Sequence, residues 1–277
     1  MSAADLASGK GHKDENFPVA SRLIRPQHRA PIMAFYHFAR AGDDIADNAG
    51  ASEDEKLAGL EAMRRTLTGH AESEPTAAAL RTALAQRKLD PAHALDLLEA
   101  FRRDVTKNRY QSWEALLDYC RYSAMPVGRF VLDVHGESRA WWPANDALCA
   151  ALQIINHLQD CSGDYRALDR VYLPQDMLAA ASARTEDLAA PSASPALRAV
   201  IVDTAARCES LLAESAGFAR AIADRRLALE VAVIQRLAED LARRLKMRDP
   251  LATRIVHRKA EAVGLAMRAV IGRLLGR

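Results

Sequence analysis

The stretch 28-HRAPIMAFYHFARAGDDIAD-47 carries the pattern that decides the fold class. Ile32, Phe35, Phe38 and Ile45 recur at steps that bring them to one side of a helix, and all four are apolar enough to be buried. Stretches with the same periodicity fill most of the chain, whereas the alternation typical of β-strands is nowhere convincing. We therefore expect an all-α bundle. Its further helices are expected near residues 53–68, 76–88, 91–107, 111–135, 145–165, 195–218, 220–246 and 252–275.

Composition indicates a globular chain and excludes several classes of protein. Of the 277 residues, 49% are hydrophobic and 27% charged, which allows a substantial core. A formal net charge of +2 is too small to indicate a polyanionic partner such as nucleic acid. No uncharged apolar run approaches the roughly 20 residues of a membrane span, and the first residues lack the apolar core of a signal peptide. The four cysteines form no C-x-x-C pair, so we expect a cytoplasmic protein.

The chain is expected to form one domain, residues 15–277, after a flexible tail of residues 1–14. Residues 181–196 hold two prolines and several small residues. They are predicted to form a surface loop within this domain, because helical periodicity resumes directly after them. Asp90 followed by Pro91 is typical of a helix N-cap with proline at the first helical position.

The opening stretch ends in a group of three acids, Asp43, Asp44 and Asp47. Like charges four residues apart on a helix destabilise it by a few tenths of a kcal/mol. Such a group therefore indicates either a solvated helix face or a site where a cation binds.

A second stretch, 153-QIINHLQDCSGD-164, places Asn156, Asp160 and Asp164 four residues apart inside an apolar helix. A four-residue step rises about 6 Å and returns to nearly the same face, so these side chains form one stripe and the first acids form another. Two such stripes facing each other would line a cavity with oxygen atoms. Mg²⁺ prefers oxygen ligands and commonly binds a few carboxylates together with substrate phosphates. The pattern therefore predicts Mg²⁺ that holds a diphosphate leaving group.

Two arginines strengthen this prediction. Arg40 and Arg170 lie near the two stripes in the sequence and would bind a diphosphate already bridged by metal. Taken alone, either stripe is more simply explained as a solvated helix face, because acids four apart are frequent in a chain with 27% charged residues. Two stripes in apolar segments, each near an arginine, are stronger evidence for a site. His157 is more simply a structural residue than a ligand.

Four tyrosines, Tyr36, Tyr119, Tyr122 and Tyr172, are by default aromatic residues of the core or its rim. They gain a role only if they face the same cavity. There, their ring faces would stabilise a carbocation by cation–π attraction.

The two motifs, their order and their distance resemble the squalene/phytoene synthase family of head-to-head prenyl synthases. The similarity extends from about residue 15 to about residue 270. The resemblance implies a single-domain isoprenoid-synthase helical bundle, in which two aspartate-rich helices face each other around a central cavity.

Matched position by position, the resemblance implies three groups of site residues. The implied metal ligands are Asp43, Asp47, Asn156, Asp160 and Asp164. The implied catalytic residues, near the diphosphate and the reacting carbons, are Tyr36, Arg40, Tyr119, Asn156, Arg170 and Tyr172. The implied substrate contacts are Gln153 in the cavity and, in the tunnel for the prenyl chain, Ala124, Val127 and Gly128.

Two departures from the family's pattern narrow the resemblance. The stretch 13-KDENFPVAS-21 stands where many members have a serine-rich phosphate loop, and Gln159 stands where a basic residue is common. Both features look most like the bacterial hydroxysqualene synthase branch, which converts presqualene diphosphate into hydroxysqualene, a hopanoid precursor. The branch implies substrate contacts by Lys13, Asn16, Phe17 and Gln159. It also implies a presqualene diphosphate synthase before this enzyme and a hydroxysqualene reductase after it.

The reaction implied by this branch is ionisation of the diphosphate with Mg²⁺, rearrangement of the cation in an apolar pocket and capture by water, with no nicotinamide. Asn156, His157 and Gln159 are candidates to position the water, and the sequence singles out none of them. The alternative enzyme condenses two prenyl diphosphates into presqualene diphosphate, phytoene or, with NADPH, squalene. The non-enzyme alternative is a catalytically inactive assembly factor of the same fold, against which the four intact outer aspartates argue.

The stretch 260-AEAVGLAMRAVIGRLLGR-277 sets apolar residues among arginines. We expect it to form the last core helix of the bundle. The alternative is a helix that also contacts an anionic membrane surface from the cytoplasmic side, where basic residues and an apolar face act together.

Overall fold

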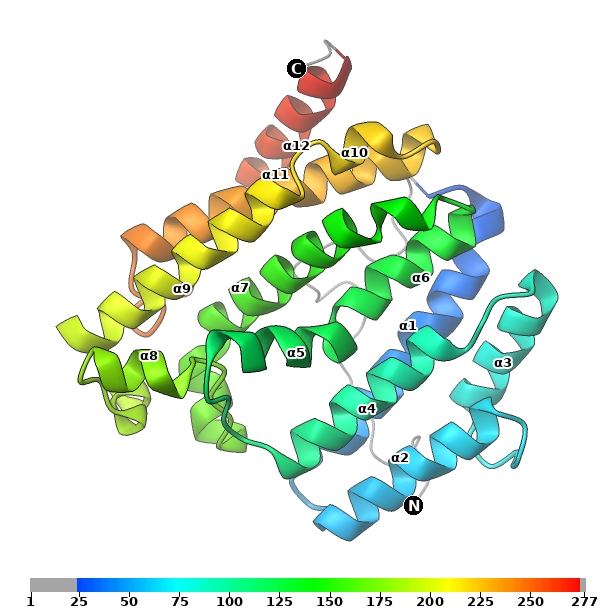
Figure 1. Cartoon of the computed structure of the whole chain (residues 1–277), viewed down its shortest axis with the longest axis horizontal. Helices are drawn as coiled ribbons and strands as arrows, with labels where there is room; N and C mark the ends of the chain where they lie inside the picture. Colours follow the sequence, from blue (N-terminus) through cyan, green and yellow to red (C-terminus); the bar gives the residue numbers. More distant parts are fainter. Residues whose placement is uncertain (1–23, 275–277) are drawn as a thin grey trace. The chain divides into compact units, whose positions relative to one another are not determined.

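The computed structural model describes residues 24–274, with side chains up to residue 272. Every regular element in this part of the chain is a helix (Figure 1), and the only strand-like pairing described there is a single β-bridge. The expected all-α class is confirmed. The chain divides into two compact units, Met1–Lys107 with Arg121–Arg139 and Asn108–Cys120 with Ala140–Arg277.

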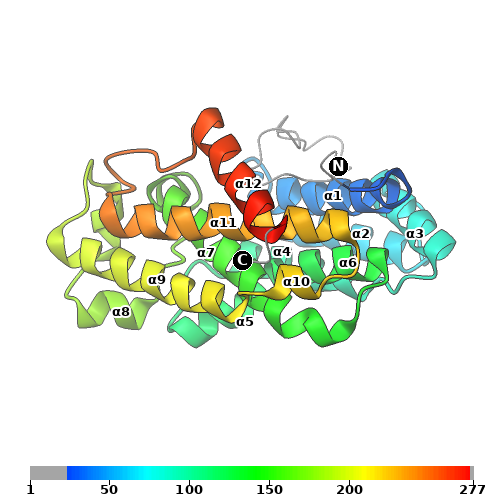
Figure 2. The same ribbon diagram turned by 90° about the horizontal axis from the view of Figure 1, so that it is seen from above.

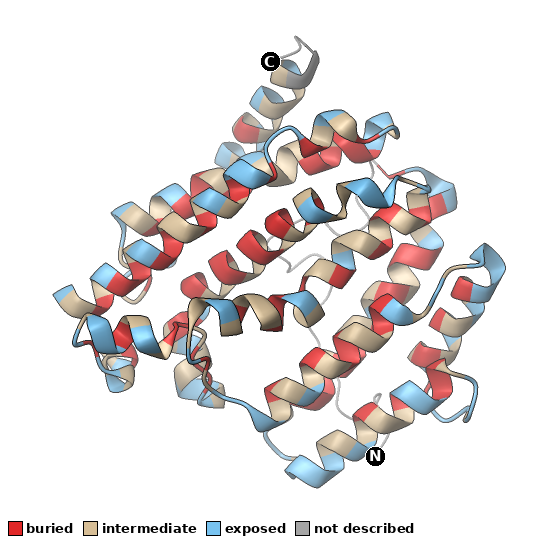
Figure 3. Cartoon of the chain, viewed as in Figure 1, coloured by how far each residue is buried: buried red, intermediate tan, exposed pale blue. Residues whose placement is uncertain are grey.

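The first unit packs its helices around α1. Phe38 of α1 is fully buried, as are Met63 and Leu80 from other helices of this unit, and the buried positions follow one side of each helix (Figure 3). Phe35 stacks on Phe130, with 4.0 Å between the ring centroids. The helices of this unit are α1 (Pro26–Asp47), α2 (Glu53–Leu67), α3 (Pro75–Arg87), α4 (Ala92–Thr106) and α6 (Met125–His135), and α1 contacts each of the other four.

The second unit is built on three long helices, because α7 packs against α9 and α11, and α9 also packs against α11. The last helix, α12, lies against α11 (Figure 2). The elements of this unit are most of α5 (Trp113–Ser123), η2 (Arg139–Trp141), α7 (Trp142–Leu168), α8 (Gln175–Ala180), η3 (Thr185–Ala189), α9 (Pro195–Glu214), α10 (Phe218–Ala221), α11 (Arg225–Met247) and α12 (Lys259–Leu274).

Helix boundaries differ from the expected ones where a proline or a cap decides them. The range expected as one helix, 111–135, is two helices, because Pro126 has no N–H to donate and instead lies in the first turn of α6. Residues 252–258, expected to be helical, precede α12 as a coil. The predicted loop 181–196 contains the short helix η3. The expectation that Asp90 is an N-cap with Pro91 at the first helical position is wrong by one residue, because Pro91 itself is the N-cap of α4. Asp90 precedes the cap and accepts a hydrogen bond from the N–H of Ala92 at 2.8 Å.

Two expectations, about the N-terminal tail and about the extent of the domain, stay untested predictions. The predicted flexible tail, residues 1–14, lies outside the described residues, and the extent of one domain over residues 15–277 stays a prediction. Helix α12, expected to be a core helix, is buried on one side only, since Leu265 is 9% exposed and Val263 is 57% exposed.

Candidate active site

The first aspartate stripe lies at the C-terminal end of α1, where one arginine pairs with two acids. Arg40 Nη1 lies 3.1 Å from Asp43 Oδ2, and Arg40 Nη2 donates a hydrogen bond to Asp44 Oδ1 at 2.8 Å. The Asp44 side chain is only 8% exposed, whereas that of Asp43 is 39% exposed. Asp44 is therefore a buried partner of Arg40, and Asp43 keeps surface for another ligand.

The Asp43 carboxyl is held in a strongly unfavourable environment for its negative charge. Although the side chain keeps 39% of its surface, protein surrounds the carboxyl closely enough that loss of hydration raises its pKa from 3.8 to about 7. The charges of Asp47, Asp104 and Asp44 act in the same direction, and that of Arg40 opposes them. A divalent cation would compensate this excess of negative charge.

Asp104, on α4, is an acid that the sequence motifs did not indicate. Its side chain is 8% exposed and its charge acts on Asp43. The two helices approach closely beside it, since a Cβ atom on Gly42 would lie 2.6 Å from Cδ2 and Cε2 of Phe101. Glycine at position 42 thus allows the α1–α4 packing that brings Asp104 near the stripe. In the sequence, Asp104 falls at the helical spacing of the apolar residues Leu97, Ala100 and Phe101, which is the signal that could have found it.

The other predicted site residues of the first unit differ in how far they are buried. Tyr36 of α1 is partly buried, with its ring 5.6 Å from the ring of His37. Ala124 is 7% exposed, Val127 is 42% exposed and Gly128 is intermediate. A tunnel lined by the last three residues stays a prediction.

The second stripe lies on α7, in the second unit. Asp160 is exposed, whereas Asn156 and Asp164 are partly buried. His157 Nδ1 lies 3.9 Å from Asp164 Oδ2, and His157 Nε2 lies 3.1 Å from the side-chain nitrogen of Gln153. The structure therefore brings Gln153, His157 and Asp164 together along one side of α7.

The side chain of Gln159 is buried and contacts the segment before α12. Its side chain is 9% exposed, and its amide N–H donates a hydrogen bond to the carbonyl oxygen of Ile255. This bond ties α7 to the coil before α12. A substrate contact by Gln159 stays a prediction.

An aromatic cluster lies beside the second stripe. The rings of His157 and Tyr172 are stacked, with centroids 3.4 Å apart and planes 12° apart. Tyr119 lies 5.6 Å from Tyr172 and 6.2 Å from His157, and Tyr110 lies 5.0 Å from Tyr119. Tyr119 and Tyr172 therefore belong to one cluster within this unit, and a role for either in the reaction stays a prediction. Sequence reasoning missed Tyr110 and did not place His157 in an aromatic stack.

Backbone pairing between two distant segments builds this cluster. Arg109 and Val171 form a parallel β-bridge, and the N–H of Val171 donates to the carbonyl oxygen of Asn108 at 2.9 Å. Arg109 Nη2 also pairs with Asp169 Oδ1 at 2.6 Å. The residue between, Arg170, is 7% exposed. The pairing sets residue 110 beside residue 172, which sequence spacing cannot reveal.

The donor atoms fit Mg²⁺, although neither unit holds a complete set of ligands. Among the described side chains, the aspartates form no group of three ligand atoms within 4.8 Å of one another. Mg²⁺ typically keeps several waters and binds one or two carboxylates plus substrate phosphates, so such a group is not required. Asp43 and Asp47 belong to the first unit and Asp160 and Asp164 to the second. That the two stripes face each other stays a prediction, as do the contacts of Lys13, Asn16 and Phe17, which lie outside the described residues.

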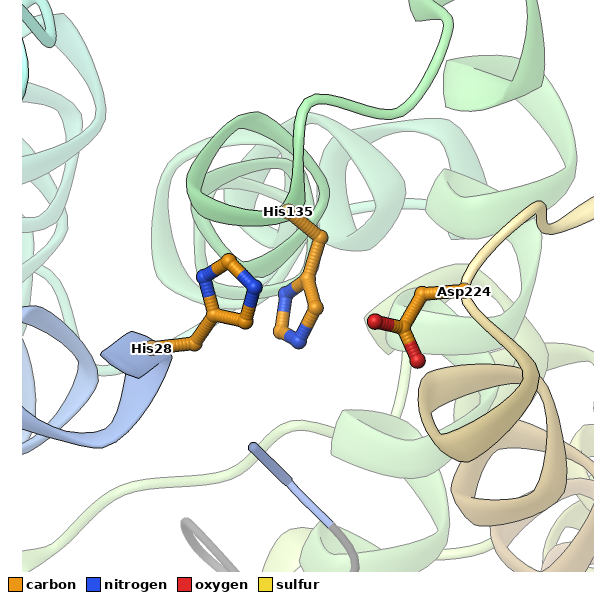
Figure 4. A group of neighbouring side chains, drawn as sticks. All are labelled: His28, His135 and Asp224. Atoms are coloured by element: carbon orange, nitrogen blue, oxygen red, sulfur yellow. The ribbon is translucent and has the colours of Figure 1, made fainter. Parts of the chain in front are cut away.

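The first unit also contains a pair of histidines, which lies at the N-terminal end of α1, away from the aspartate stripe at the C-terminal end of that helix. The rings of His28 and His135 lie 4.2 Å apart (Figure 4), and Arg87 Nη2 lies 3.0 Å from His28 Nδ1. Asp224, also drawn in Figure 4, belongs to the second unit, where it caps α11 by accepting from the N–H groups of Arg226 and Leu227. Arg87 of α3 also donates a hydrogen bond to the carbonyl oxygen of Val134 on α6 at 3.1 Å, so the pair belongs to the packing of α1, α3 and α6.

Comparison with known proteins supplies an independent line of evidence. A family model described as squalene/phytoene synthase matches residues 10–262. A hydroxysqualene synthase from Zymomonas mobilis is 59% identical over 276 residues, covering 99% of this chain and 93% of that protein.

Two solved structures have the same fold. The squalene synthase HpnC from Alicyclobacillus acidocaldarius superposes with a TM-score of 0.74 at 33% identity, covering 88% of this chain and 92% of that one. A dehydrosqualene synthase in complex with ligand superposes with a TM-score of 0.80 at 20% identity, covering 99% and 97%. The expected isoprenoid-synthase fold is thereby confirmed. None of the helices between residues 24 and 274 has the length and apolar composition to span a membrane.

Proposed function

The chain belongs to the squalene/phytoene synthase family, and we propose that within this family it converts presqualene diphosphate into hydroxysqualene with Mg²⁺. The observation that carries this proposal is the 59% identity, over 99% of the chain, to a protein named hydroxysqualene synthase. The family membership supports an enzyme that uses a prenyl diphosphate.

In this proposal the reaction begins with loss of the diphosphate. The C–O bond breaks and its electron pair leaves with the diphosphate, which Arg40 and Arg170 stabilise electrostatically. Asp43 and Asp47 on α1, and Asn156, Asp160 and Asp164 on α7, are the residues that would hold Mg²⁺, which would supply Lewis-acid stabilisation of the same charge. The raised pKa of Asp43 supports this role, because lost hydration first and the neighbouring acids second disfavour the anionic carboxylate there, and a bound cation would offset both.

The aromatic cluster acts on the carbocation that remains. The ring centroids of Tyr119 and Tyr172 lie 5.6 Å apart, and a ring face that a cation can reach attracts it by about 0.5–2 kcal/mol. The cation rearranges, the oxygen of a water molecule forms the new C–O bond, and the water loses one proton. We propose that His157 and Gln153 orient that water. Their side chains lie within hydrogen-bonding distance of each other, and the His157 ring stacks on the ring of Tyr172. Gln159 is less suited, since its N–H bonds to Ile255.

A second candidate is condensation of two prenyl diphosphates into presqualene diphosphate, squalene or phytoene. It is supported by the name of the Alicyclobacillus acidocaldarius protein, a squalene synthase, at 33% identity. An inactive assembly factor has less support, because the acids of both motifs are present.

The proposed reaction also defines partners and a compartment. An enzyme that makes presqualene diphosphate must supply the substrate, and a reductase that acts on hydroxysqualene would consume the product in hopanoid biosynthesis. We place the enzyme in the cytoplasm, because all four cysteines are unpaired thiols and three of them are buried.

Product analysis separates the two candidates. The purified protein is incubated with Mg²⁺ and either presqualene diphosphate or farnesyl diphosphate, each with and without NADPH. We expect hydroxysqualene from presqualene diphosphate and no effect of NADPH. Rapid consumption of farnesyl diphosphate, giving presqualene diphosphate, squalene or a phytoene-like product, would contradict the proposal and favour the second candidate.

A further inference from the structure

The segment that follows α7 carries two of the residues proposed to act in the reaction. Arg170 is buried, and the ring of Tyr172 stacks on the ring of His157. Both residues lie beyond Leu168, the last residue of α7, so their positions depend on how the chain turns as it leaves the helix. Whatever fixes this turn therefore also places the arginine proposed to stabilise the diphosphate and the ring proposed to stabilise the carbocation.

The turn requires a backbone conformation that residues other than glycine rarely adopt. Asp169, directly after α7, has φ 51° and ψ 33°, in the left-handed region. Glycine is the usual residue at such a helix end, and aspartate is tolerated there better than most other residues. The turn lets the N–H of Arg170 donate back to the carbonyl oxygen of Asp164 at 3.3 Å. The left-handed residue thus links Arg170 to a candidate metal ligand on α7.

Arg109 binds this turn from a segment that lies 60 residues earlier in the chain. Its Nη2 donates to Asp169 Oδ1 at 2.6 Å, and its Nη1 donates to the backbone carbonyl oxygen of Asp169 and, at 2.9 Å, to that of Asn108. The guanidinium carbon lies 6.0 Å from the centroid of the Tyr165 ring, in the last turn of α7. The planar guanidinium group therefore holds both the side chain and the backbone of the left-handed residue, which the single ammonium group of a lysine does less well.

Backbone hydrogen bonds hold Arg109 and its neighbour against the segment after the turn. Arg109 and Val171 form a parallel β-bridge, and the N–H of Gln175 donates to the carbonyl oxygen of Tyr110 at 2.9 Å. The ring of Tyr110 stacks on that of Tyr172, with centroids 5.7 Å apart. The backbone of Arg109 is thus paired with the segment that carries Tyr172, and its side chain closes the turn before that segment.

A simpler explanation is that Arg109 only stabilises the fold. Ion pairs at a protein surface contribute little as a rule, and the side chain of Asp169 is 66% exposed. A pair formed for stability alone would not need to select the left-handed residue, nor to bind its carbonyl oxygen as well. Binding both groups favours one backbone conformation of Asp169 over the others, which is how a residue outside a site can orient the residues within it.

We propose that Arg109 is a positioning residue, which holds Asp169 in the left-handed conformation and so sets Arg170 at the diphosphate and Tyr172 at the carbocation. The inference rests on the proposed function for the roles of Arg170 and Tyr172, and Arg109 acts only through Asp169. Without the Arg109 side chain, the segment after α7 samples other directions. Because the negative charge of the leaving group is largest in the transition state, a misplaced Arg170 lowers kcat more than it raises KM.

Amide hydrogen exchange tests the turn without any substrate. In Arg109→Ala, the N–H groups of residues 169–172 should exchange about tenfold faster than in the unaltered chain, because the turn opens more often. Arg109→Lys keeps the charge without the fork and should show most of this increase, so it replaces Arg109→Ala if that variant does not fold. The matched control is Arg207→Ala, which removes an arginine paired with the exposed Asp203 of the same unit at 3.3 Å. It should leave exchange at residues 169–172 unchanged.

Kinetics tests the effect of the turn on the reaction. On presqualene diphosphate with saturating Mg²⁺, Arg109→Ala should lower kcat about 10- to 100-fold and change KM less than about threefold. Adding Asp169→Gly to this variant should recover most of the lost kcat, since glycine adopts the left-handed conformation without support. Arg207→Ala should keep the kcat of the unaltered chain. All rates are measured well below the unfolding temperature of each variant, where a loss of stability alone leaves kcat unchanged.

Three results would overturn the proposal. They are unchanged exchange at residues 169–172 in the Arg109 variants, unchanged kcat in those variants, and a loss of kcat that Asp169→Gly does not reduce. Failure of the proposed function is a different result, because the unaltered chain then forms no hydroxysqualene. In that case the same variants are compared on farnesyl diphosphate, whose diphosphate must also leave, and the same three results decide on Arg109.

Discussion

The close approach of α1 and α4 next to the first aspartate stripe makes a strong prediction about Gly42. A Cβ atom there would lie 2.6 Å from two carbon atoms of the Phe101 ring, so Gly42→Ala must displace the ring or the helix. Overpacking of a core costs about 1–3 kcal/mol. In a helix interior, alanine is also favoured over glycine by about 1 kcal/mol. The net expectation is a decrease of the free energy of unfolding by up to about 2 kcal/mol.

A double-mutant cycle isolates the clash from the helix propensity. In the background Phe101→Ala the ring is absent, and Gly42→Ala should then stabilise the protein by about 1 kcal/mol. The difference between the two backgrounds should therefore be about 1–3 kcal/mol, measured by urea unfolding followed by circular dichroism. If Gly42→Ala raised the free energy of unfolding equally in both backgrounds, the packing argument that places Asp104 near Asp43 would be wrong.

Three further predictions concern Asp43, Asp160 and Tyr172. The pKa of Asp43 is about 7 in the folded protein against an ordinary value of 3.8, so the folded state binds this proton more tightly. Without Mg²⁺, the free energy of unfolding should therefore fall as pH rises from 3.8 to 7, and Asp43→Asn should reduce this slope in pH-dependent urea unfolding. Asp160→Asn should lower turnover on the order of 100-fold at saturating Mg²⁺ with an unchanged circular dichroism spectrum; full activity would contradict a metal role for this residue. Tyr172→Leu should lower kcat about 2- to 30-fold, whereas Tyr172→Phe keeps the ring face and should retain most of the rate; equal losses would point to the hydroxyl instead.

Much of the fold could be predicted because helical periodicity is a local property. Residues 28–47 and 145–165 each carry enough apolar spacing to indicate a helix, and α1 and α7 are found there. The break inside 111–135 was missed although Pro126 marks it, because the apolar pattern continues on both sides of the proline. Tertiary context, and not propensity, also decides that residues 252–258 form a coil, since Ile255 and His257 are held by Gln159 and Asp240.

The candidate site was predictable to the extent that its residues are neighbours in sequence. Arg40 and Asp43 form their pair within one helix turn, and Gln153 and His157 do the same. Asp104 was missed because its contact with the stripe depends on how α4 packs on α1. The neighbours of Tyr172 were missed for the same kind of reason: Tyr110 and Tyr119 reach it through backbone pairing between distant segments.

The central claim of the proposed function is that water, and not hydride, ends the reaction. The most direct measurement is the mass of the product formed from presqualene diphosphate and Mg²⁺ in water enriched in oxygen-18, with no nicotinamide present. The proposed chemistry predicts a tertiary or secondary alcohol in which the oxygen comes from the solvent, with the label incorporated to the enrichment of the water. An unlabelled product, or no turnover until NADPH is added, would contradict it.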